Sequence, residues 1–352
     1  MIALQTNNFN FIRMIAAAMV LITHTYVLIG LGTQHDFLYQ LSNGEIMIST
    51  LGLRAFFIIS GYLIIQSMEK STSYGSYFKK RILRVFPGLI ACILFIILVL
   101  GAIYTSKPIF AYYTSATTWK YLYNISLYKG VFIIPSVFDD HIIQVINGSI
   151  WTLAYEFSYY IMVMVLCAIG IFKRKWIAGI VFCCFLCLQL LTIYTKVPGK
   201  FFYFLIYTDL QLDYFSDFGL FFSAGMLMYL YRATFTYTHR VAVLMLLFYI
   251  CSIAAGVPWV MKYVAIPYLI MYVAFLPSYG FITHWGKKTD LSYGIYIYGM
   301  PAQQVIIGFV GTSLHPELIS LLSLLLVVPI AWLSWHLVEK YFTKKAISLK
   351  SI

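Results

Sequence analysis

Charged side chains are scarce in this sequence. Asp, Glu, Lys and Arg make up only 10% of its 352 residues, whereas soluble domains carry roughly 25%. Hydrophobic residues make up 62%, and apolar runs recur from residue 11 to residue 337. A water-soluble core cannot absorb that much apolar surface. We therefore expect an all-α integral membrane protein rather than a soluble enzyme or binding domain.

The sequence also lacks the features of a secreted or divided chain. No linker or low-complexity segment separates domains, so we expect one transmembrane domain over 1 to 352 with no appended soluble domain. Residues 1 to 10 contain no Lys or Arg, unlike the start of a cleaved signal peptide. All six cysteines fall within apolar runs. They are predicted to be packing residues, not a disulfide framework or a metal site.

About ten apolar segments are long enough to cross a bilayer as helices. Their predicted ranges are 11 to 31, 46 to 67, 85 to 105, 150 to 172, 176 to 195, 214 to 231, 241 to 258, 261 to 279, 291 to 311 and 316 to 337. Two stretches between them, 106 to 149 and 196 to 213, are long. The first is rich in aromatic residues, which suit either stacking on a sugar ring or the lipid interface.

Positive charge is distributed unevenly between the connections. One side collects sixteen Lys and Arg residues and the other side six. The positive-inside rule then places both termini in the cytoplasm. The net charge of +12 is explained by this topology. A nucleic-acid surface would instead need its basic residues clustered on one folded face, so no nucleic-acid partner is expected.

Four ionisable residues fall within the predicted spans: Arg13, His24, Arg54 and Glu156. Such residues are costly in a bilayer and are functional candidates. Arg13 and His24 are eleven positions apart, which places them on one helix face roughly 16 Å apart, and we expect them to line one cavity. Arg13 alone could be a snorkelling residue, and His24 alone a structural hydrogen-bonding residue. Neutral imidazole is, however, the usual general base near pH 7.

The second predicted span contains Arg54 and the run from Phe56 to Gly61. Small residues in this run permit close contact between helices or with a ligand. Arg54 requires a partner, either Glu156 or an anionic group of a ligand. Glu156 in turn could orient His24, hold an acceptor hydroxyl, or form a structural salt bridge with Arg54.

A basic cluster follows the second span. Arg81 and Arg84 are three positions apart, so they lie on one face of a helix. Two guanidinium groups so placed are suited to gripping phosphate. The alternative is a topogenic cluster that contacts anionic lipid.

Taken together, these elements resemble the membrane acyltransferase-3 family, whose members O-acylate extracytoplasmic glycans. Five blocks carry the resemblance in the order of the family: Arg13 with His24, Phe56 to Gly61, Arg81-Ile82-Leu83-Arg84 before Pro87, Trp151-Thr152-Leu153 to Glu156, and Leu291 to Tyr296 before Pro301. The resemblance covers most of the chain.

The resemblance implies an enzyme that takes an acyl group, most often acetyl, from acyl-CoA in the cytoplasm and needs no metal. It implies that Arg81 and Arg84 bind the phosphates of acyl-CoA, while Arg13 and Ser60 line the donor's path. His24 is expected to act as general base or as a transient acyl carrier, supported by Glu156. The substrate cavity is expected to include Arg54, Trp151 and Tyr155.

We therefore expect a multi-pass O-acetyltransferase of the cytoplasmic (inner) membrane that acts on a polysaccharide or a lipid-linked glycan. Its surroundings are membrane lipid, and it can form homo-oligomers. Two other classes use the same buried charges: a transporter, in which they line a pathway, and a non-catalytic component of polysaccharide export, in which the motifs are packing elements.

Overall fold

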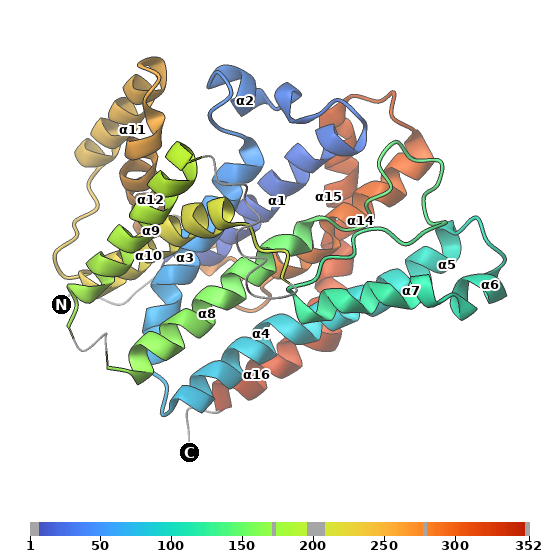
Figure 1. Cartoon of the computed structure of the whole chain (residues 1–352), viewed down its shortest axis with the longest axis horizontal. Coiled ribbons are helices and arrows are strands. Elements are labelled where there is room, and N and C mark those ends of the chain that lie inside the picture. The colour runs from blue at the N-terminus through green and yellow to red at the C-terminus, as the bar shows by residue number, and fades with distance from the viewer. Residues whose placement is uncertain (1–6, 171–173, 196–207, 277–279, 349–352) are drawn as a thin grey trace.

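The computed structural model describes residues 7–170, 174–195, 208–276 and 280–348. Within these ranges all regular structure is helical, except for one isolated antiparallel bridge between Thr105 and Val137. Figure 1 shows the long helices crossing one another in a single bundle.

A long helix overlaps each of the ten predicted spans, although the third helix begins at Tyr74, eleven residues before the predicted start at 85. These helices are α1 (Phe9–Leu28), α3 (Ile48–Glu69), α4 (Tyr74–Phe95), α8 (Leu153–Ala168), α9 (Ile177–Thr195), α10 (Leu212–Leu230), α11 (His239–Ala254), α12 (Pro258–Phe275), α14 (Ser292–Val310) and α15 (Pro316–Ser334). The predicted ends at 172 and 279 lie outside the described residues.

Six helices are long and apolar enough to cross a membrane: 9–28, 48–69, 74–104, 149–168, 177–195 and 316–345. The chain is therefore an integral membrane protein of the all-α class. The other four predicted spans are helices that fall short for two reasons. The apolar parts of α11 and α12 are shorter, whereas α10 and α14 carry polar side chains such as Asp217 and Gln303.

Short elements extend or connect these helices. The π-helical turn η2 (Ile96–Leu100) and α5 (Gly101–Tyr104) continue α4, while η7 (Trp335–Glu339) and α16 (Lys340–Ser348) continue α15. The connecting elements are η1 (Thr33–His35), α2 (Phe37–Leu41), α6 (Ile109–Thr114), α7 (Ala116–Trp119), η3 (Lys120–Ser126), η4 (Ser149–Thr152) and α13 (Gly280–His284).

Glycines bring α3 against two neighbouring helices, as the small residues of this segment predicted. A Cβ atom on Gly61 would lie 1.9 Å from the carbonyl oxygen of Phe222 in α10, and one on Gly52 would lie 2.6 Å from that of Ala16 in α1. Real Cβ atoms do not approach so closely, so only glycine permits these crossings. The contacts fix α1, α3 and α10 around the interior where the ionisable residues lie.

The aromatic stretch from 106 to 149 contains both buried and exposed rings, and Phe110, Trp119 and Tyr123 are among the exposed ones. Tyr112 and Tyr121 are fully buried, and the Tyr112 hydroxyl donates a hydrogen bond to the carbonyl oxygen of Ile97, 2.9 Å away. For these two residues both sequence-based expectations, sugar stacking and the lipid interface, are wrong. Of the second stretch, residues 196 to 207 lie outside the described residues.

The cysteines also differ from the expectation in part. All six are free thiols, and Cys92 is buried, but Cys183, Cys184, Cys187 and Cys251 are exposed on their helices. In a membrane protein such positions face lipid rather than a packed protein core.

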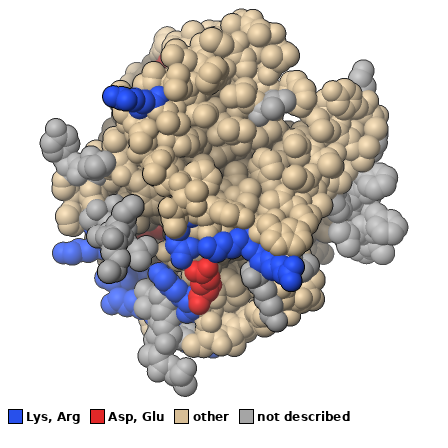
Figure 2. Space-filling view, turned by 90° about the vertical axis from the view of Figure 1, so that its left-hand side faces the viewer, with Lys and Arg blue, Asp and Glu red and all other residues tan. Residues whose placement is uncertain are grey.

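Basic residues gather at one end of the helices. Figure 2 shows Lys and Arg side chains in a band across the lower part of one face, with a few acidic groups among them and almost no charge above. Lys70, Lys79, Lys80, Arg81 and Arg84 follow one another where α3 ends and α4 begins. We refer to this side of the bundle as the basic end.

Candidate active site

Three cavities follow one another through the helix bundle. The basic cavity, of about 350 Å³, is lined by Arg13, Leu63, Gln66, Ser67, Lys70, Lys80, Arg81, Arg84, Asp290, Trp335 and Thr343. The central cavity, of about 30 Å³, is lined by Arg13, Leu53, Phe56, Phe57, Thr152, Leu153, Glu156, Tyr293 and Tyr296. Because Arg13 lines both, the two cavities are neighbours.

The third and largest cavity, which we call the histidine cavity, has a volume of about 610 Å³. Its lining includes His24, Arg54, Trp151, Asp213, Tyr214, Asp217, Lys262, Met300 and also Leu53. Leu53 therefore separates it from the central cavity. The order from the basic end is basic cavity, central cavity and histidine cavity.

The basic cavity is built around one carboxylate. Asp290 accepts a hydrogen bond from Arg84, 2.6 Å away, and pairs with Arg13 at 3.4 Å. It also accepts hydrogen bonds from the backbone N–H and the hydroxyl of Ser292, at 3.1 and 2.6 Å, at the start of α14. One side chain thus joins α1, α4 and α14.

Burial opposes the charge of Asp290, but Arg84 and Arg13 outweigh it and hold its pKa well below the usual range. Asp290 is thus ionised. It is the one carboxylate in the lining of the basic cavity, which also carries five cationic side chains, those of Arg13, Lys70, Lys80, Arg81 and Arg84. A phosphate-rich ligand fits a cavity with this excess of positive charge.

Arg81 is held in place by neutral partners. Its Nη2 donates a hydrogen bond to Ser67 Oγ at 3.2 Å, and its guanidinium lies over the rings of Tyr77 and Tyr160, 5.9 and 5.7 Å from their centroids. Its Nε has no hydrogen-bond partner among the described residues. Because neither ring carries a negative charge, the charge of Arg81 is left for a ligand.

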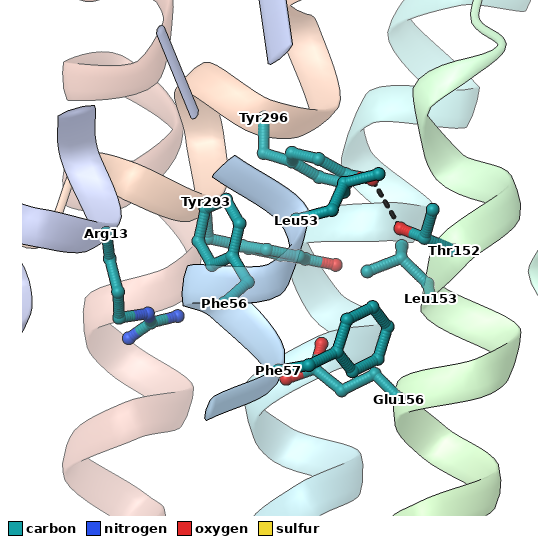
Figure 3. Close-up of a pocket in the computed structure, with 9 residues that line it drawn as sticks. All are labelled: Arg13, Leu53, Phe56, Phe57, Thr152, Leu153, Glu156, Tyr293 and Tyr296. Atoms are coloured by element: carbon teal, nitrogen blue, oxygen red, sulfur yellow. Dashed lines mark hydrogen bonds between the residues drawn. The ribbon is translucent and has the colours of Figure 1, made fainter. Parts of the chain in front are cut away.

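The central cavity is a constriction. Figure 3 shows Phe56, Phe57, Leu53 and Tyr296 around it, with Arg13 at one side and Glu156 at another. Glu156 accepts a hydrogen bond from Ser60 Oγ at 2.7 Å and a short one from the Tyr160 hydroxyl. A volume of about 30 Å³ holds about one water molecule. A larger group can pass only if these side chains move.

His24 reaches the histidine cavity from α1. Its Nδ1 lies 3.2 Å from Ser149 Oγ in η4. The Tyr296 hydroxyl of α14 donates a hydrogen bond to the Ser149 carbonyl oxygen at 2.6 Å, and it also contacts Thr152 Oγ, as the dashed line in Figure 3 marks. The imidazole is therefore oriented by a serine, which α14 in turn holds in place.

The lining of the histidine cavity also carries a network of charges. Asp217 lies 4.0 Å from Arg54 and 3.0 Å from Lys262, and it accepts a hydrogen bond from the Tyr263 hydroxyl at 2.6 Å. Beside this network the Trp151 ring packs edge-on against Tyr214, with 4.8 Å between their centroids.

The structure brings together several of the residues predicted from sequence. Arg13, Arg81 and Arg84 line one cavity, and His24, Arg54 and Trp151 line another. Arg13 and His24 do not share a single cavity as expected, because Leu53 and the aromatic rings around the central cavity lie between them.

Three further expectations differ from the structure. Arg54 pairs with Asp217 instead of Glu156, because Glu156 is directed into the central cavity by Ser60 and Tyr160. Ser60 holds Glu156 and is not among the residues that line the three cavities. Tyr155 lies one helical turn beyond Trp151. Its hydroxyl accepts a hydrogen bond from the Gln211 backbone N–H at 2.8 Å, and it lines a neighbouring pocket with Trp151 instead of the histidine cavity.

The sequence-based reasoning missed Ser149, Asp217, Lys262 and Asp290. Two signals were present: Asp290 directly precedes the block from Leu291 to Tyr296, and Asp217 lies within an otherwise apolar run. No signal in the sequence pointed to Ser149. Within the part of the chain that the structure describes, no group of three or more His, Cys, Asp or Glu could hold a metal ion.

Comparison with known proteins identifies the family of the chain. The family described as "Acyltransferase domain", acyltransferase-3, matches residues 6–336, and the chain belongs to this family of membrane acyltransferases.

Two relatives are similar to it. An "O-acetyl transferase" of Shigella phage Sf6 is 29% identical over 347 residues, 97% of each chain. "Nodulation protein 10" of Rhizobium leguminosarum bv. viciae is 29% identical over 182 residues, 48% of this chain and 46% of that protein. No solved structure matches the chain.

Proposed function

We propose that this protein transfers an acetyl group from cytoplasmic acetyl-CoA to a hydroxyl group of an extracytoplasmic or lipid-linked glycan. The observation that carries the proposal is the series of three cavities, which runs from the arginines of the basic end, past the narrow central cavity, to His24. In this proposal the ten long helices form one transmembrane domain of the inner membrane. The basic end and both termini face the cytoplasm.

The donor enters at the basic cavity. Arg81 and Arg84 bind the phosphates of CoA, and Arg13 lies where the basic and central cavities meet. The pantetheine arm of CoA is long and narrow, so it can follow the cavities inward while the nucleotide stays with the arginines. Glu156, held by Ser60 and Tyr160, lies beside the path of the thioester.

The chemistry takes place at His24. For the ring to act as a base, Nδ1–H must donate to Ser149 Oγ, which leaves the Nε2 lone pair free. Nε2 removes the proton from the acceptor hydroxyl as its oxygen attacks the thioester carbon. The C–S bond then breaks, and the CoA thiolate leaves and takes up that proton from the imidazolium. A route through an acetyl-histidine uses the same atoms in two steps.

The experiment that tests this function uses the purified full-length chain in lipid nanodiscs. We expect it to release free CoA thiol from acetyl-CoA when glycan acceptor is present. We also expect mass spectrometry to find an added acetyl mass on surface glycan only from cells that contain the protein. Movement of acceptor across vesicles without consumption of acetyl-CoA would favour a transporter and contradict the proposal.

The central cavity also predicts a preference for short acyl groups. Phe56 narrows it, with its ring edge-on to Tyr296 at a centroid distance of 5.6 Å. We expect Phe56→Ala to raise the rate with butyryl-CoA relative to acetyl-CoA by roughly tenfold, since about 1.4 kcal/mol of steric cost corresponds to that factor.

The matched control for this prediction is Phe95→Ala. Phe95 at the end of α4 packs edge-on against Tyr298 of α14, the helix that also carries Tyr296, at 5.9 Å. It lines none of the three cavities. Its removal should leave the butyryl-to-acetyl ratio unchanged. Equal use of both donors by the unmodified protein would contradict the prediction.

A further inference from the structure

The cationic and acidic side chains that line the histidine cavity balance one another. Arg54 and Lys262 contribute two positive charges, and Asp213 and Asp217 two negative charges. The basic cavity differs, since its lining holds five cationic side chains and one carboxylate. The two ends of the cavity series are therefore built for ligands of different charge. The basic cavity suits an anion, whereas the histidine cavity offers an anion no net attraction.

Two of these charged side chains have buried polar atoms that lack a hydrogen-bond partner among the described residues. Arg54 is only 6% exposed, and its Nε and Nη1 have no hydrogen-bond partner among the described residues, nor does Asp213 Oδ1. Buried polar atoms are normally paired, so these atoms indicate a ligand or water that the cavity receives. A guanidinium and a carboxylate on one wall offer donors and acceptors together, which is what a hydroxyl-rich ligand needs.

The same cavity supplies an apolar surface for a ring. Trp151 and Tyr214 line it and pack against each other at 4.8 Å, and Phe218 stacks nearly parallel to Tyr214 at 5.9 Å. Tyr214 is 41% exposed, so its face is available to a ligand. A volume of about 610 Å³ falls in the range of roughly 300–1,000 Å³ that is typical of small-molecule sites.

We propose that the wall formed by Arg54, Trp151, Asp213 and Tyr214 is the acceptor subsite, and that the sugar residue it binds is uncharged, neither a uronic acid nor an amino sugar with a free amine. This rests on the proposed function, because the reacting hydroxyl must lie beside His24 in the same cavity. The aromatic rings contact the C–H face of the sugar. Asp213 accepts hydrogen bonds from sugar hydroxyls, and Arg54 donates to their oxygen atoms.

The test compares matched acceptors with the full-length protein in nanodiscs and [14C]acetyl-CoA. The probes are two pairs, benzyl glucoside with benzyl glucuronide, and benzyl galactoside with benzyl galacturonide. We expect kcat/KM for the neutral member of a pair to exceed that for the carboxylate member at least tenfold. Asp213→Asn leaves an excess of positive charge and should reduce this ratio at least threefold. Lys262→Met should increase it.

Asp139→Asn is the control. It removes one negative charge from an exposed residue that does not line the histidine cavity, so the ratio should not change. Equal or preferred use of the carboxylate members would overturn the proposal. The proposal would also be overturned if the protein released CoA thiol with surface glycan as acceptor but labelled none of the four glycosides. Failure to consume acetyl-CoA with any acceptor would instead refute the proposed function itself.

Discussion

Replacing His24 with glutamine is expected to lower kcat for acetyl transfer by roughly 10²- to 10⁴-fold, the usual contribution of a general base. Glutamine has a similar length and can still form a hydrogen bond with Ser149 Oγ, which lies 3.2 Å from the imidazole. It cannot accept a proton near pH 7, however. The loss should therefore appear in kcat, while KM for acetyl-CoA stays within about twofold, because His24 does not line the basic cavity.

The measurement is CoA thiol release by purified protein, with glycan acetylation followed by mass spectrometry. His239→Gln is the control, since His239 is exposed at the start of α11 and lies outside the three cavities. Ser149→Ala tests orientation of the ring, and we expect a smaller loss from it than from His24→Gln. Normal acetylation by a well-folded His24→Gln protein would exclude His24 as base or acyl carrier.

Replacing Arg84 with glutamine is expected to raise KM for acetyl-CoA by about 10- to 100-fold with little change in kcat. A charge-assisted hydrogen bond is worth roughly 1.5–3 kcal/mol, which corresponds to that range. Arg84 is also the nearer arginine partner of Asp290, at 2.6 Å. Loss of Arg84 therefore leaves a buried carboxylate with only the longer contact to Arg13, and some loss of thermal stability should accompany the change in KM.

The donor acetyl-pantetheine separates these two effects because it lacks the nucleotide phosphates. If Arg84 binds phosphate, Arg84→Gln and the unmodified protein should use acetyl-pantetheine equally well, and only acetyl-CoA should distinguish them. Lys79→Gln is the matched control, because Lys79 is an exposed cation on the same helix that does not line the basic cavity. An equal loss of activity with both donors would show that Arg84 supports the folded structure and does not bind the nucleotide phosphates.

The helices were predictable because each apolar run must satisfy its backbone hydrogen bonds internally within a bilayer. For that reason all ten predicted spans appear as helices, including α10 and α14, whose polar side chains line or approach the cavities. The grouping of Arg13, Arg81 and Arg84 was predictable as well, since charged side chains near one membrane face avoid lipid and turn toward a hydrated cavity in the bundle.

The ion pairs were not predictable, because a single sequence does not determine which acidic side chain lies next to which basic one in the folded bundle. Arg54 had Glu156 as a plausible partner at the same depth, and the structure pairs it with Asp217 of another helix. The choice depends on the close crossing of α3 and α10, which Gly61 and Gly225 permit. Likewise, the contact of Ser149 with His24 depends on the hydrogen bond by which Tyr296 of α14 holds the Ser149 carbonyl oxygen in η4.

The narrowness of the central cavity has a consequence for the cell. A continuous aqueous passage between the two faces of an energised membrane would let protons and ions leak down their gradients. The space of about 30 Å³ walled by Leu53, Phe56 and Tyr296 is too tight for a hydrated ion and mostly apolar, and apolar constrictions of this kind block conduction by excluding water. Under the proposed function, the enzyme therefore carries an acyl group across the permeability barrier and keeps that barrier closed between turnovers.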